Sequence, residues 1–157
     1  GETTVERNSQ NSATEDAKLL AKAMILCSDA TYENGQGTGD PTEIALLLLG
    51  DDLGIDRKKL NTQASRVSEF SFDSDRKLMS TLTEENEKFT VYTQGAIGNI
   101  IKISTQVLEN EKVIPITEEH KKRYLAAAEE MSDNTLRTLG VAYKPVDSII
   151  FYSKSLR

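Results

Sequence analysis

The side chains that most often perform covalent or metal chemistry are scarce in this sequence. His120 and Cys27 each occur once, so no histidine–cysteine cluster is available to hold a transition metal. A catalytic triad would have to use His120, which lies among charged residues on what the sequence predicts to be a solvated helix face. The sequence therefore predicts no catalytic residue and no metal site within the chain.

Phosphate-binding loops are also missing from the sequence. The run Gly35–Asp40 (GQGTGD) resembles a dinucleotide fingerprint, but it lacks the last glycine and does not follow a predicted strand. No Gly-Lys-Ser or Gly-Lys-Thr occurs, which excludes a Walker-type loop. We therefore predict that these glycines form a loop without phosphate contacts.

The composition of the chain excludes further classes of function. The chain has 157 residues, with 38% hydrophobic and 28% charged residues, which is enough for one compact domain with a real core. The net charge of −6 argues against nucleic-acid or anionic-membrane partners. It also opposes binding of a polyanion, so any nucleotide site must rely on the base and on a few local cations. The lone Cys27 is predicted to be a buried apolar residue, as expected in a reducing cytosol.

Two kinds of periodicity predict an α/β (α+β) fold, with an antiparallel sheet flanked by helices. Helical spacing predicts helices over residues 15–30, 41–53, 97–104 and 118–131. Short segments rich in β-branched and aromatic residues predict strands over residues 67–72, 77–82, 89–93, 136–143 and 148–152. Residues 1–14 are predicted to be a flexible lead-in, and residues 15–157 a single domain cut from a longer membrane protein.

Local signals fix several helix ends. Asp40 is predicted to be an N-cap, with Pro41 in the first helical position and Glu43 closing a capping box. This helix and the one before it are expected to lie antiparallel. Thr117 is expected to cap the last helix, whose Tyr124, Leu125 and Ala128 should face inward.

Four separated segments together are similar to the nucleotide-binding domain of P-type cation-transporting ATPases, most closely the calcium-pump-like branch. They are Gly39–Glu43 (GDPTE), Phe72–Ser80 (FDSDRKLMS), Gln94–Ala96 (QGA) and Leu136–Ala142 (LRTLGVA). Each is weak alone, but their order and spacing over roughly residues 15–145 make the joint match specific.

The resemblance implies a set of nucleotide-binding residues: Glu43, Phe72, Ser74, Lys77, Met79, Gln94, Gly95, Ala96, Arg137 and Leu139. Phe72 would stack on adenine, whereas the residues alone also allow a core position, since Phe70 and Phe72 alternate along one strand. Glu43 would bind the adenine amino group, unless the capping box occupies its carboxylate.

The other implied roles also have plain structural alternatives. Lys77 would donate to the nucleotide or simply be a solvated strand lysine, and Met79 would line the pocket or belong to the core. Gly95 and Ala96 would admit the ligand close to the backbone or form a tight turn. Arg137 would reach the phosphates or pair with a surface carboxylate.

The sequence departs from the family pattern at the expected phosphate end. Gln94 stands where the family usually has lysine, and Ser74 where calcium pumps often have arginine. Neither side chain supplies a positive charge. We therefore expect weak binding of ATP and ADP, with a Kd on the order of millimolar, equivalent to about 4 kcal/mol.

The resemblance implies the rest of the functional assignment. The domain would hold ATP, with Mg²⁺ arriving with the nucleotide, and would present the γ-phosphate to an aspartate on a separate phosphorylation domain. Its partners would be ATP or ADP and the phosphorylation and actuator domains of the same polypeptide. The full protein would be a monomeric cation pump, calcium being the favoured ion, with this domain on the cytoplasmic side of the plasma membrane. Two alternatives stay open: a non-catalytic interaction module with a degenerate pocket, and a free-standing α/β enzyme.

Overall fold

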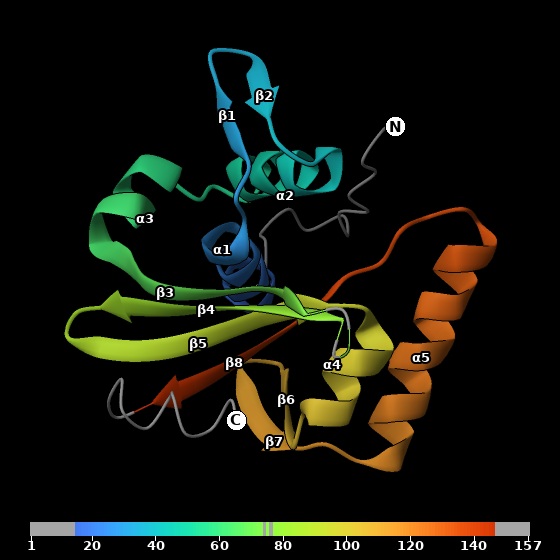
Figure 1. Cartoon of the computed structure of the whole chain (residues 1–157). Coiled ribbons are helices and arrows are strands. Elements are labelled where there is room, and N and C mark those ends of the chain that lie inside the picture. Colours follow the sequence, from blue (N-terminus) through green and yellow to red (C-terminus); the bar gives the residue numbers. More distant parts are fainter. Residues whose placement is uncertain (1–14, 74, 76, 147–157) are drawn as a thin grey trace.

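The computed structural model describes residues 15–73, 75 and 77–146, without the side chains of residues 71–73. Its elements are α1 (Glu15–Cys27), β1 (Thr31–Glu33), β2 (Gln36–Thr38), α2 (Pro41–Asp52), α3 (Arg57–Gln63), β3 (Ala64–Asp73), β4 (Leu78–Glu85), β5 (Lys88–Gly95), α4 (Ile97–Ile103), β6 (Gln106–Glu109), β7 (Lys112–Pro115), α5 (Glu118–Asp133) and β8 (Gly140–Val146). The expected α/β (α+β) class, with helices around an antiparallel sheet, is confirmed (Figure 1). The expected strand over 148–152 lies outside the described residues.

The centre of the fold is an antiparallel sheet with the strand order β3-β4-β5-β8. Because successive side chains of a strand point to opposite faces, each face has its own core. On one face, Tyr92 packs with Cys27 of α1. On the other face, Leu82 packs with Val91 and Val146. The middle of the sheet thus carries buried apolar side chains on both faces.

Helices α1 and α2 cover one face of the sheet in two layers. Figure 1 shows α1 nearly end-on beside the sheet and α2 side-on beyond it, so the two helices cross. The expected antiparallel arrangement is wrong. At Gly50 of α2, an added Cβ would come within 2.5 Å of Ile25 Cδ1, so the missing side chain allows the close crossing.

Cys27 is buried, as the sequence predicted. Its side chain is 0% exposed, and its Sγ lies 3.5 Å from Thr81 Oγ1 of β4. Burial raises the pKa of the thiol to about 11, which keeps it protonated and unreactive at neutral pH.

Two hairpins were not predicted. The glycines of 35–39 belong to the hairpin β1–β2, whose turn residues Asn34 and Gly35 both have positive φ angles, of 52° and 78°. This is the backbone that an Asn-Gly pair favours in a two-residue hairpin turn. The β6–β7 hairpin turns at Asn110 and Glu111 in the same way, with φ angles of 50° and 63°. Their strands have only three or four residues, too few to show a clear alternation.

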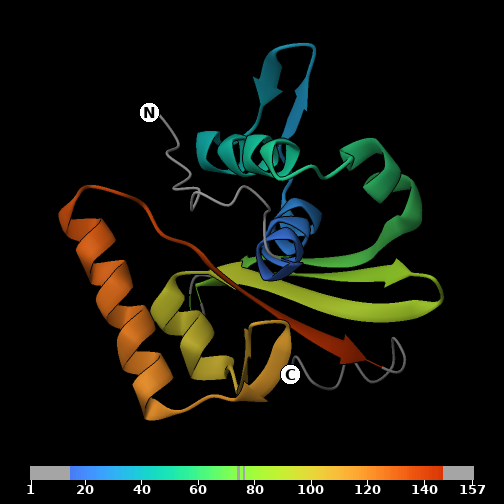
Figure 2. The same ribbon diagram turned by 180° about the vertical axis from the view of Figure 1, so that it is seen from behind.

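Helix α5 lies against α4 at the edge of the fold (Figure 2). Its predicted cap is confirmed, because Thr117 Oγ1 accepts a hydrogen bond from the His120 backbone N–H at 3.2 Å. The expectation for His120 itself is wrong: its side chain is only 13% exposed, and its ring Nδ1 accepts from the Thr117 backbone N–H at 3.0 Å. Of the three residues expected to face inward, Tyr124 and Ala128 are half-buried, whereas Leu125 is 44% exposed.

Among the described residues, no helix combines the length and the apolar character needed to cross a lipid bilayer.

Candidate functional site

The four motif segments meet at one end of the central sheet. Strand pairing places Met79 opposite Gln94 and Leu78 opposite Gly95. The next strand continues the row, with Val141 opposite Gln94 and Gly140 opposite Gly95. Segments far apart in the sequence therefore share one corner of the fold, below the start of α2 (Figure 1).

Arg137 ties the last segment to the first. Its Nη1 donates to Thr42 Oγ1 at 3.0 Å. The side chain of Asp40, at the N-cap of α2, accepts from the Thr42 backbone N–H at 2.7 Å. This hydrogen bond is the main cause that lowers the pKa of Asp40, and the Arg137 charge adds to it. A positive charge is thus held at the rim of the corner.

The carboxyl group of Glu43 does not close the capping box that the sequence suggested. The predicted N-cap Asp40 is confirmed, but the neighbours of the Glu43 carboxyl are the Asp29 backbone N–H and the Gln94 side chain rather than a capping-box partner. Burial raises the pKa of this carboxyl above its usual 4.5, and these two neighbours oppose the rise. Glu43 therefore faces the sheet beside Gln94, where it is half-buried.

This raised pKa predicts a pH-dependent effect of Glu43→Gln on stability. Because the pKa of Glu43 is raised by folding, this carboxyl binds more protons in the folded chain than in the unfolded chain. The contribution of Glu43 to the free energy of unfolding therefore falls as the pH rises above the usual pKa of 4.5. Glutamine does not titrate, so the Tm of the variant should rise relative to that of the parent as pH increases from about 4 to about 7. Thermal melts of both proteins across this range check the trend. A difference in Tm that stays constant with pH would contradict it.

Gln94 is a deeply buried polar side chain of the corner. It is 8% exposed, and its Oε1 has no hydrogen-bond partner among the described residues. A buried carbonyl without a donor costs about 1–3 kcal/mol, and native structures hold few such groups. This oxygen is closed to solvent in the structure, and an N–H donor that reached it would relieve the cost.

Gly95 has a role inside the sheet. A Cβ at this position would lie 2.6 Å from the Lys77 carbonyl oxygen and 2.7 Å from Leu78 Cδ2. Both distances are shorter than any real contact, so the pairing of β4 with β5 itself requires glycine. The tight-turn alternative also holds for Ala96, which is the exposed N-cap of α4.

The remaining predicted residues near this corner differ in how far they are buried. Lys77 is exposed in the turn before β4, with a φ angle of 56°. Met79 is half-buried and packs against the core cluster beneath α1. Leu139 is half-buried just before β8.

Two predicted residues lie outside what the structure describes: the side chain of Phe72 and all of Ser74. The backbone of Phe72 belongs to β3, but the pairing of β3 with β4 shifts register between Phe70 and Asp73. A register shift breaks the simple alternation of faces. Alternation therefore does not place Phe72 on the same face as Phe70, whose side chain is 37% exposed.

The described residues also form hollows elsewhere. One, of about 190 Å³, lies between α1, β1 and β3 and includes Arg57, Arg66 and Thr83. Another, of about 250 Å³, lies beside the start of α1. Neither is lined by a residue of the predicted site, so hollow size alone does not locate that site.

Comparison with known proteins decides the family. The family model described as the P-type ATPase cytoplasmic domain N matches residues 16–155. The chain belongs to this family.

Individual relatives of this N domain are calcium pumps by name. The Calcium-transporting ATPase 1 of Bacillus cereus is 42% identical over 131 residues, which cover 83% of this chain and 15% of the relative. The protein of the same name from Lactococcus lactis is 40% identical over 132 residues, again 83% of this chain and 15% of the relative. The Calcium-transporting ATPase 1 of Saccharomyces cerevisiae is 32% identical over 142 residues, 86% of this chain and 15% of the relative. This chain thus spans about one seventh of these relatives.

Among the residues of the corner, Asp29 was not anticipated from the sequence. It lies outside the four motif segments, between α1 and β1, and nothing in its local sequence marks it. Only the folded chain brings its backbone N–H to Glu43.

Proposed function

We propose that this N domain binds the adenine base of ATP at the corner where Glu43, Gln94 and Gly95 meet. The observation that carries the proposal is the buried Gln94 Oε1, which has no donor among the described residues, while the amide N–H₂ end of the same side chain donates to the Glu43 carboxyl. The 6-amino group of adenine supplies two N–H donors, one for each of these acceptors. Family membership supports the same assignment.

The other residues would complete the nucleotide site. Phe72 would stack on the base, with Met79 and Leu139 as apolar walls. Lys77 is exposed at the start of β4, where its charge is free to approach the ligand. Arg137 already reaches the start of α2 through Thr42, and its remaining donors would face the phosphates. Ser74 would contribute to the nucleotide site, and Ala96 would lie beside the ligand at the start of α4.

We further infer the role of the domain in a whole protein. The relatives are named as calcium-transporting ATPases, which supports a cation pump, with calcium as its cargo. In such a pump this domain would present the γ-phosphate of magnesium-bound ATP to an aspartate on a separate phosphorylation domain, and an actuator domain of the same polypeptide would complete the cycle. The contribution of this domain is to position the nucleotide.

A residue-resolved ATP titration tests the binding site. We expect amide NMR shifts at Met79, Gln94 and Gly95, with a Kd on the order of millimolar. Inosine triphosphate, which carries a 6-oxo group in place of the 6-amino group, should bind more weakly. No shift at these residues at tens of millimolar ATP would rule the site out.

Gln94→Lys separates this function from the alternative of an interaction module with an abandoned pocket. A lysine would restore the charge that the family usually has at this position, so we expect ATP to bind several-fold tighter, a gain of about 1 kcal/mol. The lysine also removes the Oε1 acceptor proposed for the 6-amino group, so the preference for ATP over inosine triphosphate should fall. Gln94→Met is a matched control of similar length without the charge. If ATP affinity does not change in the lysine variant, the pocket no longer serves a nucleotide.

A further inference from the structure

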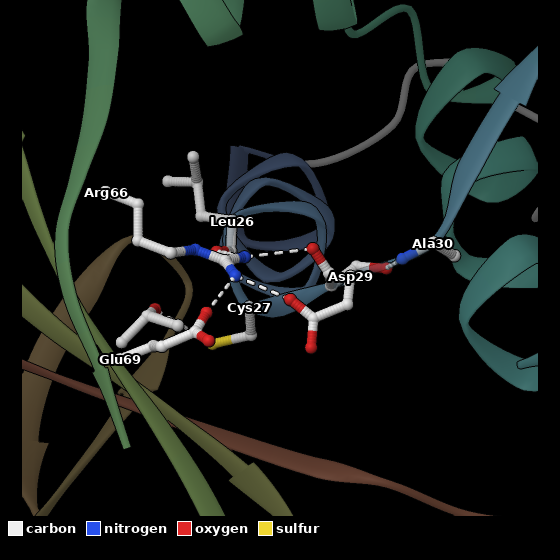
Figure 3. Close-up of polar contacts among 8 residues, drawn as sticks. Leu26, Cys27, Asp29, Ala30, Arg66 and Glu69 are labelled. Atoms are coloured by element: carbon white, nitrogen blue, oxygen red, sulfur yellow. Dashed lines mark hydrogen bonds and ion pairs between the residues drawn. The ribbon is translucent and has the colours of Figure 1, made fainter. Parts of the chain in front are cut away.

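Arg66 of β3 holds four acceptors at the end of α1 (Figure 3). Its Nη1 donates to Asp29 Oδ1 at 2.6 Å and to Glu69 Oε2 at 2.8 Å. Its Nη2 donates to the backbone carbonyls of Leu26 at 2.8 Å and Ser28 at 2.9 Å. A single guanidinium therefore joins α1, the segment after it and β3.

The sequence of α1 explains why this contact matters. The last carbonyls of a helix have no partner within the helix, and a positive charge there is favourable. The last turn of α1 contains no basic residue. Arg66, 40 residues further along the chain from Leu26, supplies both the donors and the charge, and its side chain is only 29% exposed.

The segment that Arg66 fixes, Ser28–Ala30, lies directly against the candidate site. The Asp29 backbone N–H faces the Glu43 carboxyl. The Cα of Ala30 is 3.0 Å from where a Cβ on Gly39 would lie, so this segment packs tightly against the residue before the Asp40 cap. Any shift of Ser28–Ala30 would move the partner of Glu43.

We propose that Arg66 is a positioning residue of the nucleotide site, which fixes Ser28–Ala30 and, through the Asp29 N–H, the orientation of the Glu43 carboxyl group. This inference rests on the proposed function for its effect on nucleotide binding. Arg66 does not touch the ligand; it acts through the backbone of Asp29.

Arg57 provides a matched control. It is also a partly buried arginine, with Nε 2.8 Å from Asp51 Oδ1 and Nη2 3.0 Å from the Tyr32 carbonyl. Its contacts hold the far end of α2 to β1 and include neither Asp29 nor Glu43. Replacing Arg57 should therefore reduce stability without changing the site.

The first test follows the Asp29 amide by NMR during a pH titration. In the parent chain the chemical shift of this amide should change as Glu43 ionises, and we call that change the Glu43 step. Glu43→Gln should remove the Glu43 step, which distinguishes it from effects of Asp29 and Asp40, the other charges near Glu43. Arg66→Met should remove or shrink the step, whereas Arg57→Met should keep it. If both arginine variants keep the step, the inference is wrong.

The second test compares ATP with inosine triphosphate. Arg66→Met should raise the Kd for ATP about threefold to tenfold, the range of a contact that acts through one neighbour, and should reduce the preference for ATP. Arg57→Met should leave that preference unchanged. An equal loss of preference in both variants would make Arg66 a general stabiliser and overturn the inference.

Arg66→Lys serves both tests if the methionine variant does not fold. It keeps the charge but cannot bridge four acceptors with a planar fork, so it should change the Glu43 step and the ATP preference in the same direction. If the parent chain does not bind ATP, the proposed function fails, and the Asp29 titration still decides whether Arg66 positions Glu43.

Discussion

Phe72→Ala is expected to weaken ATP binding more than tenfold. A base stacked on an aromatic ring gains about 1–3 kcal/mol, and each 1.4 kcal/mol corresponds to about a factor of ten in Kd. In an acidic chain with a net charge of −6, the phosphates contribute little, so the base must provide most of the affinity. Isothermal calorimetry or NMR titration with ATP measures the change.

Phe70→Ala is the control for this prediction. Phe70 lies on the same strand and is 37% exposed, and the pairing of β3 with β4 shifts register after it. Its removal should leave ATP affinity within about twofold of the parent, below the loss expected for a stacked ring. Equal affinities of the two variants would show that Phe72 does not stack on the base.

Gly95→Ala is expected to destabilise the fold by about 1–3 kcal/mol, the usual cost of overpacking. The added methyl would lie 2.6 Å from the Lys77 carbonyl oxygen. A backbone atom of the neighbouring strand cannot move aside as the end of a side chain can. Tm should fall by roughly 2–4 °C for each kcal/mol lost, as measured by thermal melts without nucleotide.

Gly98→Ala shows whether this loss is specific to the sheet. Gly98 lies inside α4, and the nearest atom to an added Cβ is Leu125 Cδ2 at 3.9 Å. Alanine favours a helix over glycine by about 0.5–1 kcal/mol, so this variant should melt higher than the parent. If Gly95→Ala melts like the parent but loses ATP binding, Gly95 serves the ligand and not the sheet.

The sequence predicted the central elements because their patterns are local. The N-cap Asp40 and the first-turn Pro41 begin α2 as expected, and the apolar and β-branched runs of β4 and β5 form paired strands. The order of the four motif segments was sufficient to indicate the family, which the match over residues 16–155 confirms. No contact between distant residues was needed for these conclusions.

Tertiary structure decided what surrounds each motif. The acidic residue in the first turn of α2 suggested a capping box, but packing of α2 over the sheet turns Glu43 toward Gln94. A glycine before an alanine suggested room for a ligand, and strand pairing shows that Gly95 is also required by the sheet. The contact of Arg66 with Asp29 spans 37 residues, and no local pattern encodes it. Such contacts depend on which helices and strands pack side by side, and the residues adjacent in the sequence do not determine that packing.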